Sequence, residues 1–294
     1  MIAFAAALTD PEAYRRYAAP GIARVAEPDS VVLPFANPAG PARGANLLLE
    51  QAGRLEDLEA LVIVHETVEL TDPGTCATIR ATLADPEVAV AGCVGAAGAP
   101  TIAWWEGEVS SAPIVHRHHE HGGGDVAAFA WTQPRPAPME VEALDGFLLV
   151  LSPWAVRELR FDETLHGPYG QDRDFCRQVE QAGRKLTTAA IPVVRHRPLK
   201  PVEDLELWVE CHMAYAEKWA PPEGVDWKGR ARRAEAMREA ARTMAYTNAS
   251  LLDARVAELE TALAKVTDSP SWRLTLPLRR LNQRRRARGG PPRG

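Results

Sequence analysis

Runs of apolar residues alternate with amphipathic segments along the first 95 residues of the chain. Short runs of Ala, Val, Ile and Leu are typical of buried strands, and apolar residues spaced three and four apart are typical of helices. The runs predict strands at residues 2–8, 31–35, 60–64 and 88–91. One helix is predicted to follow the first strand, capped by Asp10 and with Pro11 in its first turn. Two further helices are predicted at residues 44–52 and 73–84. This alternation predicts an α/β fold with a doubly wound, mostly parallel sheet.

The alternation stops at residues 92–140, which are rich in Gly, Pro, Trp and His and are too long for an ordinary connection. We interpret this segment as an irregular functional insertion. Periodicity resumes at residues 141–151. The remaining predicted elements are a short helix opened by Ser152 and Pro153, a helix at 171–182 closed by Gly183, a strand at 186–194 and a helix at 202–219.

A long helix rich in Ala, Arg and Glu is predicted at residues 228–266. Apolar residues recur along it at intervals of four and three, which is the pattern of a coiled-coil seam; they are Leu252, Val256, Leu259, Leu263 and Val266. The helix either pairs with a second copy, giving a homodimer, or packs on its own domain. We therefore divide the chain into a domain at 1–220, a helical extension at 221–268 and a tail at 269–294.

The net charge of −5 is distributed unevenly along the chain. Residues 271–294 contain eight arginines and no acidic residue, which leaves 26 basic against 39 acidic residues in the rest of the chain. An acidic body is unfavourable for a nucleic-acid enzyme, and no nucleic-acid partner is expected. Arginines beside Trp272 and Leu274 fit adsorption to an anionic membrane surface, with a disordered, solvated tail as the alternative.

Segments that would place the chain outside the cytoplasm are not found in the sequence. No window approaches the roughly 20 apolar residues of a membrane span, and the apolar run at residues 2–8 is too short for a signal peptide. The four cysteines are widely spaced, so we expect reduced, buried thiols. We therefore expect a cytoplasmic protein, with peripheral contact to the inner face of the cell membrane through its tail.

A series of short motifs occurs in a fixed order between residues 104 and 219. The motifs are Trp104 to Gly107, Asp145-Gly146, Phe161-Asp162-Glu163, Tyr169 to Phe175, Ala182-Gly183 and Glu217 to Trp219. The series resembles the family-2-like glycosyltransferases of the GT-A fold, in the branch described as glycosyltransferase-like. The resemblance implies a hexosyl- or deoxyhexosyl-transferase that moves a sugar from a nucleotide-diphosphate donor, with inversion, to a glycan or lipid-linked acceptor in cell-surface polysaccharide biosynthesis.

Inverting transfer requires a carboxylate that takes the proton of the acceptor hydroxyl while the diphosphate departs. The resemblance places this catalytic base at Asp172, at the start of the predicted helix 171–182. The alternative is that Asp172 and Asp174 only cap and neutralise that helix end. Of the two carboxylates, Asp174 fits the structural role better.

The resemblance also implies donor-binding residues near the ends of the first and third strands and at one helix start; they are Thr9, Asp10, Gly44, Asn46, His65, Glu66 and Thr67. Relatives have a metal-binding Asp where this chain has Thr67. Either Glu66 takes over the Mg²⁺ or Mn²⁺, or the metal is held weakly with help from His196, or the leaving group is neutralised without metal. A departure of this kind also fits a catalytically inactive glycan-binding or scaffold protein, which is the alternative function.

On the acceptor side, the resemblance implies contacts from Trp105, Asp145, Gly146 and Gln171. Trp104 and Trp105 either stack on sugar or pack in the core, where alternation along a strand would bury one of them. Four histidines and one glutamate lie close together at His116, His118, His119, Glu120 and His121. We interpret them as a loop or lid on the acceptor side, with an adventitious metal cluster as the alternative.

Overall fold

The computed structural model describes residues 1–36, 40–99, 101–118, 124–127, 133–196, 204–219 and 225–275. The chain forms two compact units, Met1–Ser250 and Leu251–Gly294. The first unit is an α/β domain that includes the first part of a long helix, which the sequence analysis assigned to a separate extension. The second unit begins within the same helix.

Seven strands form the central sheet, in the order β11-β14-β5-β13-β3-β1-β2. Their bounds are β1 Ile2–Leu8, β2 Val31–Ala36, β3 Ala60–Val64, β5 Val88–Gly92, β11 Glu140–Val141, β13 Leu148–Leu151 and β14 Lys185–Thr188. Strand β1 is parallel to β2 and β3, and β14 is parallel to β5, whereas β13 runs antiparallel between β3 and β5. The α/β class and the doubly wound mixed sheet that the GT-A resemblance implies are therefore confirmed.

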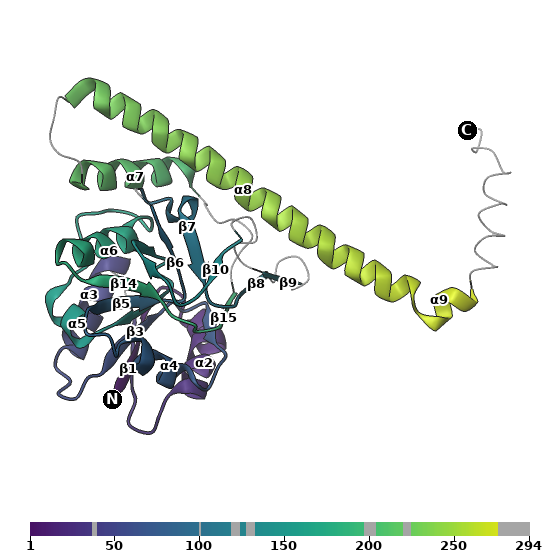
Figure 1. Cartoon of the computed structure of the whole chain (residues 1–294), viewed down its shortest axis with the longest axis horizontal. Coiled ribbons are helices and arrows are strands. Elements are labelled where there is room, and N and C mark those ends of the chain that lie inside the picture. The colour runs from purple at the N-terminus through teal and green to yellow at the C-terminus, as the bar shows by residue number, and fades with distance from the viewer. Residues whose placement is uncertain are drawn as a thin grey trace. The chain divides into compact units, whose positions relative to one another are not determined.

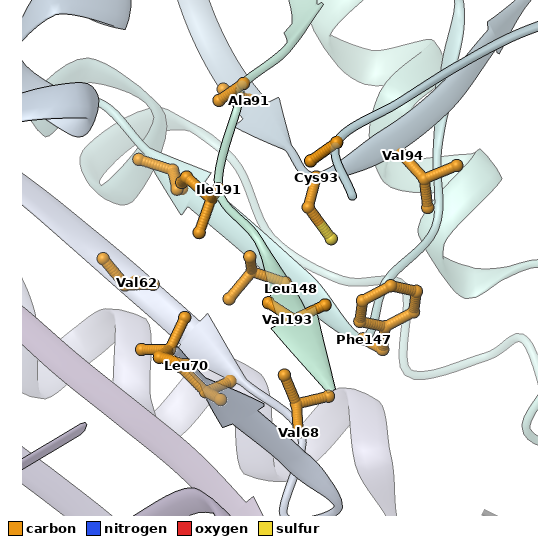
Figure 2. Packing of buried hydrophobic residues seen from close by; sticks show 14 of the residues in the cluster. Val62, Val68, Leu70, Ala91, Cys93, Val94, Phe147, Leu148, Ile191 and Val193 are labelled. Carbon is orange, nitrogen blue, oxygen red and sulfur yellow. The ribbon is translucent and has the colours of Figure 1, made fainter. Parts of the chain in front are cut away.

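Helices cover both faces of this sheet (Figure 1). One face carries η1 Tyr14–Ala18, α2 Ala19–Val25 and α4 Thr75–Thr82, and the other carries α3 Pro41–Ala52, α5 Pro153–Glu158 and α6 Gln171–Gln181. Ile2 and Phe4 of β1 pack in the first core, while Ala3 and Ala5 pack in the second. Figure 2 shows the first core around Leu148. Because both faces are covered, the inner strands β1, β3, β5 and β13 are apolar throughout.

The predicted caps are present where the helices begin and end. The Asp10 carboxylate accepts from the N–H groups of Glu12 and Ala13 at the start of α1 Pro11–Ala13. The Ser152 hydroxyl accepts from the N–H of Ala155 and caps α5. Gly183 follows α6 with φ 67°, the left-handed conformation that favours glycine at this position.

The prediction that residues 92–140 are irregular was wrong. They contain β6 Val94–Ala97, η2 Trp104–Glu106, β7 Glu108–Ser111, β8 Ile114–His118, β9 Gly124–Ala127 and β10 Arg135–Pro136. These strands enter two further sheets, β10-β7-β6-β12 with β12 Ala143–Leu144, and β4-β15-β8-β9 with β4 Val68–Leu70 and β15 Val193–His196. Because β6 and β8 pair with strands that are distant in the sequence, a local pattern does not reveal them.

The prediction of a single strand at residues 186–194 was also wrong, because the chain forms two strands there, β14 and β15. The two strands belong to different sheets and are separated by Pro192, which cannot donate a backbone hydrogen bond. This change of sheet carries the end of β15 away from the core of the central sheet. As a result, Arg195 and His196 lie beside β4 and β8.

The predicted long helix is confirmed as α8 Val225–Thr267, which is preceded by α7 Leu205–Trp219 and followed by α9 Pro270–Leu274. Within the first unit, Ala236 and Ala240 of α8 are buried together with Trp208 and Tyr215 of α7 and with Ile102. This third core fixes residues 101–105 between the two helices. The predicted seam residues, from Leu252 onward, are exposed in the second unit.

Candidate active site

The carboxyl ends of the inner strands β1 and β3 lie beside the segment that leads into β13, and together they form one edge of the central sheet, at the ends of its strands. Leu148 pairs with Val64 at this edge, and the N–H of His65 donates to the carbonyl of Phe147 at 2.9 Å. Doubly wound sheets open their ligand crevice at the carboxyl ends of their parallel strands. The side chains around this edge therefore form the candidate active site.

Asp172 lies in the first turn of α6, opposite the loop that joins β12 to β13. One carboxylate oxygen accepts from the N–H of Gly146 at 3.1 Å, and the other accepts from the N–H of Arg173 at 2.8 Å. The residue before the helix, Gly170, has φ 81° and gives the chain the left-handed turn with which α6 begins. This arrangement brings the predicted residues Asp172 and Gly146 together.

The pKa of Asp172 is raised to about 6. Burial of the carboxylate is the largest cause, and the negative charge of Asp145 adds to it, while the N–H groups of Gly146 and Arg173 act in the opposite direction. A helix N-terminus alone would lower a carboxylate pKa, so desolvation and Asp145 outweigh it here. A carboxylate with a pKa near neutrality can act as a general base under physiological conditions.

Asp174, two residues further along α6, links this helix to α7. Its carboxylate is buried and contacts the Lys218 ammonium at 2.5 Å and the Trp219 indole N–H at 2.9 Å. Arg173 is buried as well, and its guanidinium donates to the carbonyls of Ala99 and Glu142. These contacts tie α6 to α7 and to the segment after β6, and they fix the helix start that presents Asp172.

Arg195, near the end of β15, reaches the same edge of the sheet. A terminal nitrogen of its guanidinium lies 3.6 Å from the Asp145 carboxylate, and the group stacks over the Phe147 ring at 4.4 Å. Its Nε is buried and has no hydrogen-bond partner in the described part of the chain. An unpaired buried donor costs about 1–3 kcal/mol, so this atom is an exception that calls for an explanation. Arg195 was not among the predicted site residues, although it directly precedes His196, which was.

His65 and Thr67 form a small turn after β3. The Nδ1 of His65 accepts from the N–H of Thr67 at 3.2 Å and lies 2.9 Å from the Thr67 hydroxyl. Although His65 is exposed at the surface, protein atoms crowd its ring, and this desolvation together with the charge of Arg195 lowers its pKa to about 4. The ring is therefore neutral at pH 7, with its proton on Nε2, which leaves Nε2 as a donor.

Glu66, which the resemblance places at the donor site, is engaged by Thr9 in this structure. Both of its carboxylate oxygens accept from Thr9, one from the backbone N–H at 2.7 Å and one from the hydroxyl at 2.5 Å. The side chain is buried, so these bonds connect the ends of β1 and β3. The donor-binding roles of Thr9 and Glu66 remain predictions, but their present contacts are structural.

His196 is engaged by Tyr17 and Glu69. Its ring stacks on Tyr17 with 3.8 Å between ring centroids, and its Nε2 lies 3.1 Å from the carboxylate of Glu69. Glu69 also contacts Arg24 at 3.2 Å. Within the described ranges, no three His, Cys, Asp or Glu side chains are grouped as metal ligands. The predicted metal pair of Glu66 and His196 is thus not brought together.

The other predicted donor residues have local partners. The Asn46 amide donates to the Phe161 carbonyl at 2.9 Å and to Glu163 at 2.9 Å, and its oxygen accepts from the Phe161 N–H at 2.8 Å. Asn46 therefore holds the Phe-Asp-Glu motif against α3. Gly44 lies inside α3, and Asp10 caps α1. The donor-binding roles of these three residues stay predictions.

On the acceptor side, Trp105 and Gln171 have different surroundings. The Gln171 amide donates to the carbonyls of Leu165 and Gly167, so it is used within its own loop. Trp104 is buried and Trp105 is half-buried, and the two rings meet edge to face with centroids 5.7 Å apart. They lie on η2, so alternation along a strand is the wrong explanation for the burial of one of them. Trp105 Nε1 is buried without a partner in the described part of the chain.

Two sequence predictions fall partly outside the described residues. His116 and His118 lie on β8, but His119, Glu120 and His121 are outside them. The tail beyond residue 275 is outside them as well, and with it most of the proposed membrane-binding arginines. Among the helices that are described, none combines the length and the apolar character that crossing a membrane requires. All four cysteines are buried and free, as predicted.

A buried polar cluster that sequence reasoning missed links α7 and α8. The carboxylate of Glu239 accepts from the Thr101 hydroxyl at 3.0 Å and lies 3.3 Å from Nδ1 of His212. Burial raises the pKa of Glu239 to about 7 and lowers the pKa of His212. A polar residue on an otherwise apolar helix face was the available signal. The cluster anchors α8 to the segment that carries Trp104 and Trp105.

Comparison with known proteins gives one curated relative and several solved structures. No family model matches the chain. The streptomycin biosynthesis protein StrF of Streptomyces griseus is 27% identical over 199 residues, which cover 67% of this chain and 66% of that protein. The chain thus matches slightly less than two thirds of the length of this curated relative.

The solved structures align at low sequence identity. The mannosyltransferase PcManGT from Pyrobaculum calidifontis, in complex with GDP-Man and Mn²⁺, is 13% identical, with a TM-score of 0.46 over 93% of this chain and 81% of that one. GalNAc-T7 with UDP, GalNAc and Mn²⁺ is 11% identical, with a TM-score of 0.46 over 85% and 57%. A197 from STIV is 12% identical, with a TM-score of 0.37 over 64% and 80%.

Proposed function

We propose that this protein is a GT-A glycosyltransferase that transfers a sugar from a nucleoside-diphosphate donor to an acceptor hydroxyl with inversion, using Asp172 as the base. The observation that carries the proposal is the position of Asp172 in the first turn of α6, held by Gly146, with a pKa raised to about 6 beside Asp145. The ordered motifs from Trp104 to Trp219 support the same class.

In the proposed reaction, Asp172 takes the proton of the acceptor hydroxyl. The hydroxyl oxygen attacks the anomeric carbon from the face opposite the diphosphate, and a new glycosidic bond forms as the bond to the diphosphate breaks. The diphosphate leaves with the bonding electron pair. The raised pKa of Asp172 suits this role, because a base works best when its pKa lies near the working pH.

The donor in this proposal lies over the edge formed by the ends of β1 and β3. His65 presents a neutral ring there, and Thr67 occupies the place of the metal-binding Asp of the resembled family. The residues predicted to hold Mg²⁺ or Mn²⁺ do not fit a divalent cation, because Glu66 is engaged by Thr9 and His196 faces Tyr17 and Glu69. No step of the proposed reaction passes through a metal.

For the acceptor, we propose a glycan or lipid-linked glycan of cell-surface polysaccharide assembly, approached from the side of Trp105. The half-buried Trp105 keeps part of its indole ring accessible, which suits contact with a sugar ring. Because StrF is named as a streptomycin biosynthesis protein, acceptors from antibiotic biosynthesis belong in the same tests. We also propose a cytoplasmic location, with the basic tail on an anionic membrane surface.

The alternative class is an inactive glycan-binding or scaffold protein, and Thr67 is the residue that favours it. The two classes are separated by incubating the protein with UDP-, GDP- and dTDP-linked hexoses and deoxyhexoses and measuring release of the nucleoside diphosphate. Turnover that falls about 10²- to 10⁴-fold in Asp172→Asn supports the enzyme.

The matched control is Asp85→Asn, which removes an exposed carboxylate paired with Lys185 near the opposite edge of the sheet. This variant should keep full turnover. A protein that binds glycans but turns over none of the donors, or an Asp172→Asn variant as active as the wild type, would reject the proposed function.

A further inference from the structure

The residues at the carboxyl ends of β1 and β3, where the proposed donor lies, supply few oxygen ligands for a divalent cation. Such cations are bound through oxygen ligands, and beside a diphosphate Mg²⁺ is usually held by one or two carboxylates of the protein together with the phosphate oxygens. Thr67 carries no carboxylate, Glu66 is committed to Thr9, and Glu69 is shared between His196 and Arg24. Asp145, the remaining carboxylate beside His65, faces Arg195.

The same edge does contain a cation, which is the guanidinium of Arg195. The group stands over the Phe147 ring at 4.4 Å, and the Phe147 carbonyl accepts from His65, the first residue after β3. The side chains of Arg195 and Asp145 are each 19% exposed, so the pair is largely buried but still accessible to solvent. A guanidinium held in this way lies next to the segment where a donor diphosphate would bind.

Arg195 forms no hydrogen bond through its guanidinium with the residues that the structure describes. Its closest carboxylate contact, at 3.6 Å, is an ion pair that is too long for a hydrogen bond, and its buried Nε has no partner in the described part of the chain. Arg173, by contrast, donates to two carbonyls and to the Glu180 carboxylate. An arginine has five N–H donors in a fork that matches the oxygens of a phosphate group.

We propose that Arg195 binds the diphosphate of the donor directly and supplies, in place of a divalent cation, the positive charge that stabilises the departing nucleoside diphosphate. This inference rests on the proposed function and adds the group that neutralises its leaving group. Asp145 holds the guanidinium near the diphosphate through the long ion pair, and the Phe147 ring fixes its plane. As the glycosidic bond to the donor breaks, the negative charge on the diphosphate grows, and the fixed guanidinium interacts more strongly with it.

Binding of UDP, GDP and inorganic pyrophosphate to the full-length protein, measured by isothermal titration calorimetry, tests this proposal. Each titration is run in EDTA and again with Mg²⁺ or Mn²⁺. We expect at least one nucleotide to bind in EDTA with a Kd within about threefold of the value with metal. Arg195→Gln should weaken this binding about 10- to 100-fold, as expected when charge-assisted hydrogen bonds are lost. Arg195→Lys, which keeps the charge but not the fork, should lie between.

Arg184→Gln is the matched control, because Arg184 donates to the Pro86 carbonyl near the opposite edge of the sheet. Circular dichroism shows whether each variant is folded, and Arg195→Lys serves if Arg195→Gln is not. Binding that requires Mg²⁺ or Mn²⁺ and is equal in wild type and Arg195→Gln would overturn the inference while leaving the proposed function intact. A wild type that binds none of the probes under any condition would overturn both.

Discussion

The N–H of Gly146 donates to the carboxylate of Asp172 at 3.1 Å, and a Cβ added at residue 146 would lie 3.0 Å from the Cβ of Asp172. The glycine thus both binds the proposed base and leaves the space that the base occupies. Since Asp172 is fixed in the first turn of α6, it cannot move away without disturbing the helix start.

Gly146→Ala is expected to displace the Asp172 carboxylate by a few tenths of an ångström while the fold is kept. Because a misplacement of 1 Å can cost about 10²-fold in rate, we expect kcat to fall by roughly 3- to 10-fold. Gly229→Ala in α8 is the control, since an added Cβ there meets no atom within 4 Å. Unchanged kcat in Gly146→Ala would show that the contact does not position a base.

Asp145→Asn is expected to lower the pKa of Asp172, because the negative charge of Asp145 is one of the two causes that raise it. The folded-state pKa of Asp172 is raised, so activity that needs the carboxylate is lost as the pH falls through about 6. In the variant, this acidic limb of the kcat/KM profile should move to lower pH. A limb that stays in place or moves to higher pH would contradict the electrostatic link between the two residues.

Glu239→Gln is expected to stabilise the protein more at pH 8 than at pH 5. The pKa of Glu239 is about 7 in the folded state, against 4.5 for an ordinary glutamate. As the pH rises from 4.5 through 7, the unfolded state releases its proton first, so wild-type stability falls and the loss is complete above pH 7. The amide cannot ionise and can still donate to His212.

Urea unfolding of the Glu239→Gln variant should therefore give a free energy of unfolding about 1–3 kcal/mol above wild type at pH 8, and a difference near zero at pH 5. Glu206→Gln, which changes an exposed carboxylate of α7, should show no such pH dependence. A larger gain at pH 5 than at pH 8 would contradict the assignment.

The exposed apolar residues of α8 lead us to expect a homodimer. Leu252, Leu259 and Leu263 are 66%, 52% and 60% exposed, and their spacing is that of a coiled-coil seam. Light scattering coupled to gel filtration should give twice the chain mass for the full-length protein and a single chain mass for Leu259→Lys. A monomeric wild type would show that the seam does not join two copies.

Local sequence patterns predicted the strands and helix ends that are determined by residues close together in the sequence. The strands β1, β3 and β5 are buried on both faces and are therefore continuous apolar runs, and Asp10, Ser152 and Gly183 mark helix ends through short-range hydrogen bonds and backbone geometry. Strands β6 to β10 and β15 were missed or merged. Pairing with segments distant in the sequence, and not local composition, determines where β6, β8 and β15 lie.

The sequence motifs predicted one part of the candidate site. Asp145, Gly146 and Asp172 do meet, because the loop before β13 packs against the start of α6. The donor-binding roles of Glu66 and Asn46 stay predictions, and each residue also has a structural partner more than 50 residues away in the sequence. Arg195 was missed, because its nearness to Asp145 depends on the change of sheet after β14.

The pH dependence of turnover in wild type and Asp172→Asn tests the central claim most directly. With the donor that the panel identifies, wild-type kcat/KM should rise with pH through an apparent pKa of about 6. Asp172→Asn should be folded, bind the donor with an unchanged Kd and turn over about 10²- to 10⁴-fold more slowly, and its residual rate should lack this limb. If Asp172→Asn keeps wild-type turnover or the same acidic limb, Asp172 is not the base.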